Sequence, residues 1–141
     1  MTTPRSRNPA SRFVAEMRPL NDWLEKYEYL IQLGDELPRI PEAERTSERA
    51  ISGCQSQVWV AVELRDGRMR FLGDCDAKIT RGILALVLAV VEGRTPQEVA
   101  AEDFDCIREI GLSTQLSPSR ANGLASIIQR VRRLAEAHLP H

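Results

Sequence analysis

Apolar residues recur along the chain with two different periods, which divide it into predicted helices and strands. A first helix is predicted from Asn21, a candidate N-cap, to Gly34, because apolar residues follow helical spacing there: Trp23, Leu24, Tyr27, Leu30 and Ile31. Two prolines, Pro38 and Pro41, then keep residues 37–44 out of regular structure.

An alternating pattern begins at Val58 and predicts a strand, with every second residue on one apolar face: Val58, Val60, Val62 and Leu64. The pair Asp66-Gly67 is a typical hairpin turn, and Met69 and Phe71 continue the apolar face on the return strand. Residues 49–51 are a candidate for a short third strand.

The segment 77–92 is apolar on nearly all sides, which predicts a central buried helix that Gly93 ends. Asp76 is expected to cap this helix, because a carboxylate satisfies free N–H groups and suits the helix dipole. A capping box with proline at the first helical position, Thr95 to Glu98, predicts a short helix that reaches about Ala101.

Two further helices are predicted in the last third of the chain. Residues 104–110 form a short turn of helix ended by Gly111, and Ser117-Pro118 begins a final helix with one apolar stripe: Leu124, Ile127, Ile128, Val131 and Leu134. The order of elements predicts an α+β domain, in which helices pack on one face of a small antiparallel sheet of two or three strands.

Composition narrows the class of protein. The 141 residues are 43% apolar and 28% charged, with a net charge of −1 and charges of both signs interleaved. No basic face is implied and aromatic residues make up only 5%, so nucleic acid is not an expected partner. The longest apolar run, residues 83–91, is about half of the ~20 residues that cross a membrane, so no membrane association is expected.

The sequence predicts a single domain with a short tail at each end. Residues 1–12 lack the apolar core of a secretory signal and are expected to form a disordered tail, residues 13–137 a single domain, and residues 138–141 a C-terminal tail. An odd count of three cysteines does not suggest a disulfide framework, and a reducing cytoplasm is the expected location.

Cys54 is the first candidate for chemistry. It lies among the small, polar residues 52–57, directly before the strand and therefore on a predicted loop tip. Free cysteines are usually buried as small hydrophobes, but a hexapeptide without a bulky apolar residue cannot bury a thiol by its own packing. We therefore expect an exposed, reactive thiol. The only histidines, His138 and His141, lie in the C-terminal tail, so activation by another protein is favoured over a Cys–His enzyme.

The other candidates are less specific. Cys75 lies between two aspartates at a helix start, where either an incidental small residue or a sulfur relay fits. Cys106 has apolar neighbours and is expected to be buried and inert. The sequence lacks the close Cys-x-x-Cys pair that usually marks a metal site, although a scaffold could gather ligands that are distant in sequence. Arg120 is expected in the first turn of its helix, where a cation is slightly unfavourable because it opposes the helix dipole. It is therefore either an ordinary surface residue or a contact for a partner's carboxylate or anionic sulfur.

Five segments occur in the order found in the SufE family, which the chain resembles from Phe13 to Ala137: Trp23 to Gly34, Gly53-Cys-Gln-Ser-Gln-Val-Trp59, Gly73-Asp-Cys-Asp76, Gly93-Arg-Thr-Pro96 and Leu116-Ser-Pro-Ser-Arg120. The second segment is the most specific. The resemblance implies a fold like that of SufE and IscU-type proteins. It also implies a carrier that accepts persulfide sulfur from a cysteine desulfurase of the SufS or CsdA kind, stimulates it, and delivers sulfur to iron–sulfur cluster assembly, such as a SufBCD-like scaffold.

The family's acceptor cysteine corresponds to Cys54, and the resemblance implies loop support or partner contacts for Gly53, Gln55, Asp76 and Arg120. No cofactor is expected in this chain, since pyridoxal phosphate (PLP) belongs to the partner desulfurase. The family commonly has serine where this chain has Cys75, which makes Cys75 a candidate second thiol.

Two alternatives to the carrier also agree with the sequence. One is an iron–sulfur or zinc-binding scaffold that uses Cys54, Cys75 and Cys106. The other is a free-standing thiol enzyme of the rhodanese type, which would need its own activating groups around the loop.

Overall fold

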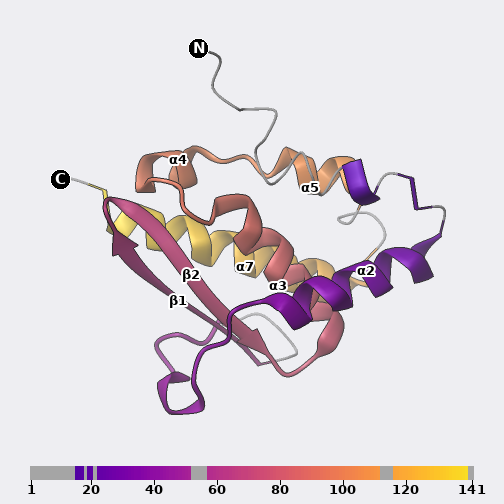
Figure 1. Ribbon diagram of the computed structural model, residues 1–141, viewed down its shortest axis with the longest axis horizontal. Coiled ribbons are helices and arrows are strands. Elements are labelled where there is room, and N and C mark those ends of the chain that lie inside the picture. The colour runs from indigo at the N-terminus through magenta and orange to yellow at the C-terminus, as the bar shows by residue number, and fades with distance from the viewer. Residues whose placement is uncertain (1–14, 18, 21, 52–56, 112–115, 140–141) are drawn as a thin grey trace.

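The computed structural model describes residues 15–17, 19–20, 22–51, 57–111 and 116–139. Its helices and strands follow in the order α2 (Trp23–Glu36), η2 (Glu42–Glu44), β1 (Val58–Arg65), β2 (Arg68–Cys75), α3 (Lys78–Val91), α4 (Pro96–Ala101), α5 (Asp105–Ile110) and α7 (Pro118–Ala137). β1 and β2 form a two-stranded antiparallel sheet, and the helices lie alongside it (Figure 1). The predicted α+β architecture is confirmed.

The hairpin turns where the sequence predicts. Asp66 and Gly67 both have positive φ, 53° and 77°, and connect the paired residues Arg65 and Arg68. Two central residues with positive φ make the tight turn that matches the twist of antiparallel strands. The resulting register pairs Val58 with Cys75, and it places Val58, Val60, Met69 and Phe71 in the core, each at most 4% exposed. The predicted apolar face does not stay buried to the end of β1, since Val62 is half-buried and Leu64 is 43% exposed.

Both outer edges of the hairpin are covered. Along β2, the Met69 and Gly73 N–H groups donate to the carbonyl oxygens of Arg94 and Pro38, at 2.8 and 3.2 Å. The outer edge of β1 pairs with the predicted third strand through few contacts: a bridge between Ala50 and Trp59, Val60 N–H to Arg49 O at 2.9 Å, and Ile51 N–H to Val58 O at 2.8 Å. Residues 38–51 therefore run from one edge of the hairpin to the other.

α3 is the central buried element, as predicted. Ten of its 14 residues are buried, and eight of these are apolar residues that share one core with the inner face of the hairpin and with the buried apolar residues of α7. The sheet approaches α3 closely at Gly73, where a Cβ atom would lie 2.9 Å from Leu84 Cδ2.

α2 crosses α3 at a glycine contact that the sequence pattern does not reveal. The pattern predicts that Gly34 ends the first helix, but α2 continues to Glu36, and its cap is Asp22 rather than Asn21. Gly34 instead lies against α3, where a Cβ atom would be 2.9 Å from Gly82 N. A Cβ atom on Gly82 would lie only 2.1 Å from Leu30 O, so both glycines allow the two backbones to approach.

The later helices begin as predicted, because their caps are local in sequence. The Thr95 hydroxyl accepts from Glu98 N–H at 3.2 Å while the Glu98 carboxylate accepts from Thr95 N–H at 2.9 Å, and this hydrogen bonding lowers the pKa of Glu98. Gly111, with φ of 87°, ends α5, and the Ser117 hydroxyl caps α7.

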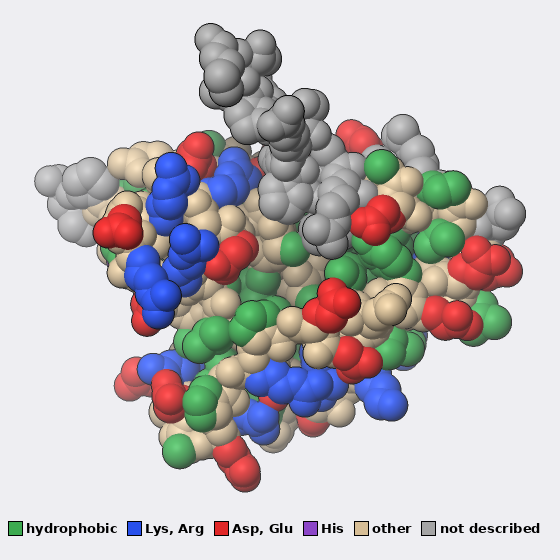
Figure 2. All heavy atoms as spheres, viewed as in Figure 1, with side chains coloured by type: hydrophobic (Ala, Val, Ile, Leu, Met, Phe, Trp, Pro, Cys, Tyr) green, Lys and Arg blue, Asp and Glu red, His purple; other side chains and the backbone are tan. Residues whose placement is uncertain are grey.

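Acidic and basic side chains lie next to one another on the face shown in Figure 2, in keeping with the interleaved charges of the sequence. Within the part of the chain that the structure describes, no helix has both the length and the apolar character needed to cross a bilayer.

Replacing Gly82 by alanine is expected to destabilise the domain by about 1–3 kcal/mol, because the added methyl group would collide with the α2 backbone. A glycine-to-alanine change in a helix ordinarily stabilises by about 1 kcal/mol. The sign of the change in the free energy of unfolding therefore distinguishes the collision with α2 from the gain in helix propensity. Chemical denaturation measures the difference. Ala125→Gly on the exposed side of α7 serves as the control for helix propensity alone, and a Gly82→Ala protein as stable as wild type would contradict the close crossing.

Candidate functional site

The predicted acceptor Cys54 and its neighbours Gly53 and Gln55 lie outside the described residues. The structure does describe the two ends between which they are held. Before the segment, Ile51 is buried and its N–H donates to Val58 O at 2.8 Å. After it, Gln57 leads directly into β1. Residues 52–56 thus connect two stretches that pair with each other at one end of the hairpin.

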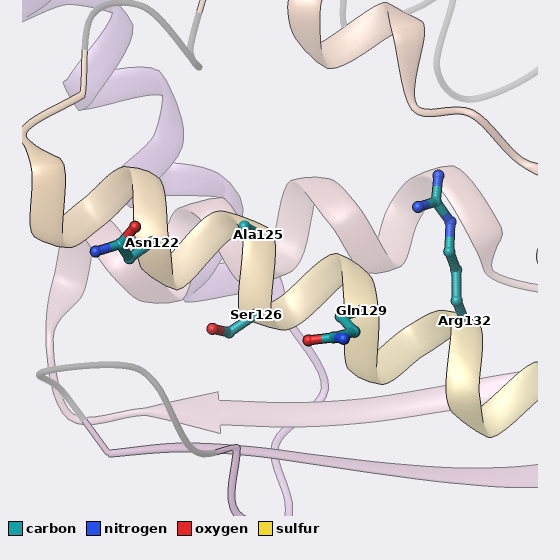
Figure 3. A pocket seen from close by; sticks show the side chains of 5 residues that line it. All are labelled: Asn122, Ala125, Ser126, Gln129 and Arg132. Carbon is teal, nitrogen blue, oxygen red and sulfur yellow. The ribbon is translucent and has the colours of Figure 1, made fainter.

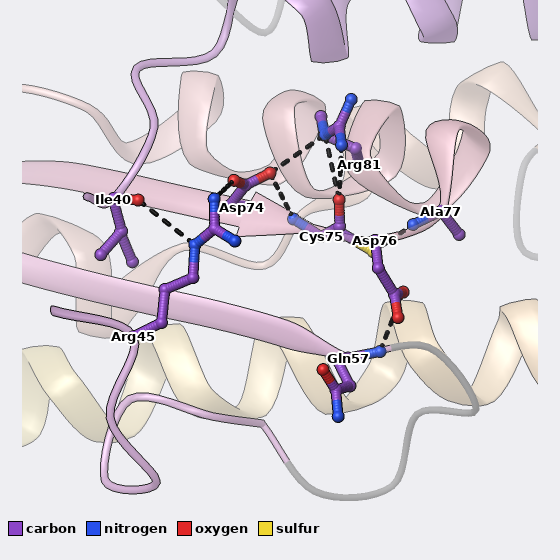
Figure 4. A network of polar contacts seen from close by, with 8 residues as sticks. All are labelled: Ile40, Arg45, Gln57, Asp74, Cys75, Asp76, Ala77 and Arg81. Carbon is purple, nitrogen blue, oxygen red and sulfur yellow. Dashed lines mark hydrogen bonds and ion pairs between the residues drawn. The ribbon is translucent and has the colours of Figure 1, made fainter. Parts of the chain in front are cut away.

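Asp76 holds the second of these ends. Its carboxylate accepts a hydrogen bond from Gln57 N–H at 3.1 Å, and its own N–H donates to Gln57 O at 3.2 Å (Figure 4). The prediction that Asp76 caps the following helix is wrong, since Ala77 is the N-cap and no side chain caps α3. The carboxylate is used across the hairpin instead, at Gln57, three residues from Cys54 in sequence.

A buried ion cluster lies next to Asp76. The Asp74 side chain is only 3% exposed, and its two carboxylate oxygens bind Arg45 Nη2 at 2.5 Å and Arg81 Nε at 3.1 Å (Figure 4). Burial of a carboxylate requires such partners, because an unpaired buried charge is strongly unfavourable. Sequence reasoning missed both arginines.

The same cluster fixes the backbone of the turn between β2 and α3. Arg81 donates to Cys75 O from both Nε and Nη2, at 3.1 and 2.7 Å, while Cys75 N–H donates to the Asp74 carboxylate at 2.7 Å. Arg45 also donates to Ile40 O and stacks over the Trp59 ring, with 5.3 Å to the ring centroid. The two residues that precede Asp76 are therefore both held by the cluster.

The two described cysteines lie in different surroundings. Cys75 is 1% exposed at the end of β2, and its Sγ accepts a hydrogen bond from Ala77 N–H at 3.4 Å. Cys106 is half-buried in α5, where burial, with a smaller contribution from the nearby Glu102 charge, raises the pKa of its thiol to about 11. A thiol with that pKa is almost fully protonated at neutral pH, and therefore a poor nucleophile.

Arg120 contacts α2. Its N–H is bound by the Ser117 cap, and its guanidinium lies over the Tyr27 ring at 5.8 Å from the centroid. Tyr27 in turn packs against Trp23, with ring centroids 5.7 Å apart. Among the described residues, Arg120 is thus not brought into contact with Asp76, although both are predicted site residues.

The described residues contain no group of three or more His, Cys, Asp or Glu side chains that could hold a metal ion. A hollow of about 610 Å³ lies along α7 and is lined by Asn122, Ala125, Ser126, Gln129 and Arg132 (Figure 3). Its side chains are polar or small and include no nucleophilic thiol or carboxylate, so it does not resemble a sulfur site.

The elements define a small α+β domain in which the two ends of the cysteine segment are anchored at one end of a hairpin. The fold is shared with the solution structure of a hypothetical protein from Thermus thermophilus, with a TM-score of 0.75 and 18% identity, over 92% of this chain and 94% of that one. The chain belongs to the SufE family: residues 11–135 match the family's Fe-S metabolism associated domain.

Two relatives carry the same family name. An uncharacterised SufE-like protein of Rhizobium meliloti is 43% identical over 126 residues, covering 86% of this chain and 90% of the relative. One from Rhizobium etli is 43% identical over 122 residues, covering 83% and 82%. Family membership indicates a sulfur-transfer role in iron–sulfur metabolism and implies interaction with a cysteine desulfurase.

Replacing Asp74 by asparagine is expected to lower the free energy of unfolding by about 3 kcal/mol, because it removes the charge that compensates Arg81 and Arg45 in a buried setting. Urea denaturation measures the loss. Glu63→Gln is the matched control, since its ion pair with Arg65 is exposed on both sides and contributes less than about 1 kcal/mol. Equal losses in the two variants would show that the Asp74 cluster is no more than a surface ion pair.

Proposed function

We propose that this protein accepts sulfane sulfur on Cys54 from a PLP-dependent cysteine desulfurase of the SufS or CsdA kind, and that it stimulates that enzyme by removing the sulfur. It then delivers the sulfur to iron–sulfur cluster assembly, for example to a SufBCD-like scaffold. Family membership is the observation that carries this proposal, because the matched residues 11–135 include Cys54 within the motif most characteristic of the family.

The transfer needs no external oxidant or reductant. The Cys54 thiolate attacks the terminal sulfur of the donor's persulfide, a bond forms between Cys54 Sγ and that sulfur, and the donor's S–S bond breaks. The donor cysteine leaves as a thiolate, and the terminal sulfur keeps its proton. PLP acts in the partner, which generates the persulfide, so this chain requires no cofactor of its own.

The surrounding residues have supporting roles in this proposal. Gly53 and Gln55 shape the segment that enters the donor, Asp76 holds its second end at Gln57, and Arg120 contacts the desulfurase. Cys75, which is 1% exposed, is less accessible to a donor than a thiol on a loop tip would be.

The site is tested by adding a SufS-type desulfurase and L-cysteine, alkylating without reductant, and mapping peptides by mass. We expect one extra sulfur on the Cys54 peptide, removable by dithiothreitol and absent without desulfurase. Cys54→Ser should abolish both this sulfur and the stimulation of the desulfurase, whereas Cys75→Ser should retain both. Sulfur on Cys75 alone would move the acceptor site, and none on any cysteine would overturn the carrier role.

Replacing Arg120 by alanine is expected to weaken desulfurase stimulation while changing stability by about 1 kcal/mol, the order of a half-buried cation–π contact. Lys26→Ala is a matched control, because Lys26 lies over the neighbouring Trp23 ring at 4.6 Å and has no predicted role with the partner. Stimulation assays at increasing acceptor concentration, together with thermal unfolding, separate the effects. A strong shift in unfolding with normal stimulation per folded molecule would make Arg120 structural.

A further inference from the structure

Arg130 on α7 binds the stretch that leads into the cysteine segment. Its Nη1 donates to Glu48 O at 3.1 Å and its Nη2 donates to Ala50 O at 2.7 Å, across separations of 82 and 80 residues. Ala50 is the residue that bridges to Trp59 of β1, and the segment 52–56 begins two residues later. The guanidinium therefore holds the first end of the segment, as Asp76 holds the second.

Arg130 extends from a rigid support. Residues on either side of it along α7, Ile127 and Val131, are fully buried in the core. A planar guanidinium presents several N–H groups in a fixed fork, which allows it to bind two carbonyl oxygens at once. Lysine, a single flexible point charge, does not reproduce this geometry.

We propose that Arg130 is a positioning residue for sulfur acceptance: by fixing Glu48 and Ala50 against α7, it anchors the stretch that leads into the segment carrying Cys54. This inference rests on the proposed function. Attack on a persulfide requires the thiolate to approach the terminal sulfur in line with the S–S bond, and loss of alignment slows such steps strongly. A positioning residue should therefore affect the rate of transfer after docking more than docking itself.

Arg132 offers a matched control on the same helix. Its Nη2 donates to Glu102 O at 3.0 Å, and its guanidinium lies over the Phe104 ring at 5.5 Å. Arg130→Gln and Arg132→Gln each remove a guanidinium bound to backbone carbonyl oxygen, but only Arg130 contacts the stretch that leads to Cys54. If losing a hydrogen bond from arginine to a backbone carbonyl oxygen acted only by lowering stability, both variants would show the effect.

The experiment measures persulfide formation on Cys54 from a SufS-type desulfurase at increasing acceptor concentration, in wild type and both variants. For Arg130→Gln we expect the maximal rate to fall roughly tenfold, with the half-saturating concentration changed less than about twofold. Arg132→Gln should stay within about twofold of wild type in both quantities, and Arg130→Lys should not restore the rate. Protection of the buried Cys75 against iodoacetamide, measured in the same samples, reports that each variant remains folded.

Equal rates in the two glutamine variants, with Cys75 protected in both, would overturn the role of Arg130 while the proposed function stands. A raised half-saturating concentration at an unchanged maximal rate would also overturn it, because that result assigns Arg130 to docking. If wild type itself takes no sulfur on Cys54 from an active desulfurase, the proposed function fails and this inference fails with it.

Discussion

The Asp74 carboxylate is almost fully removed from water, where an unpaired charge would cost several kcal/mol. Two guanidinium groups offset that cost, Arg81 from α3 and Arg45 from the stretch that crosses the hairpin. Because each arginine also binds a backbone carbonyl oxygen, the carboxylate connects three parts of the chain that meet at one end of the sheet. Asp76, which binds Gln57, follows this carboxylate by two positions in the chain.

The hairpin is small, and its surroundings complete it. A two-stranded sheet alone is marginal in water, but here one face packs on α3 and both edges are bonded by other segments. The backbone contact between Gly34 and Gly82 brings α2 against the same helix. Residues 52–56 therefore leave and rejoin a part of the fold that α3 and the segments along both hairpin edges hold in position.

Features that depend on neighbouring residues could be predicted from the sequence. The Asp66-Gly67 turn, the Thr95–Glu98 capping box and the buried helix after Asp76 are all confirmed, since each is encoded within a few positions. The capping role predicted for Asp76 is wrong because a carboxylate before a helix suits a cap and a cross-strand partner equally well. Arg45, one of the two partners of Asp74, lies 29 residues from it, and the partners of Arg130 lie at least 80 residues away, so no local pattern signals these pairs.

The contacts of Arg130 have a consequence for the order in which the domain is assembled. Pairing between β1 and β2 closes a loop of only a few residues and is available early in folding. The hydrogen bonds from Arg130 to Glu48 and Ala50 require α7, which lies some 80 residues further along the chain. During synthesis, the stretch before Cys54 acquires its final restraint only after the last helix has emerged and docked. A nascent chain would thus display its hairpin well before Glu48 and Ala50 are held against α7.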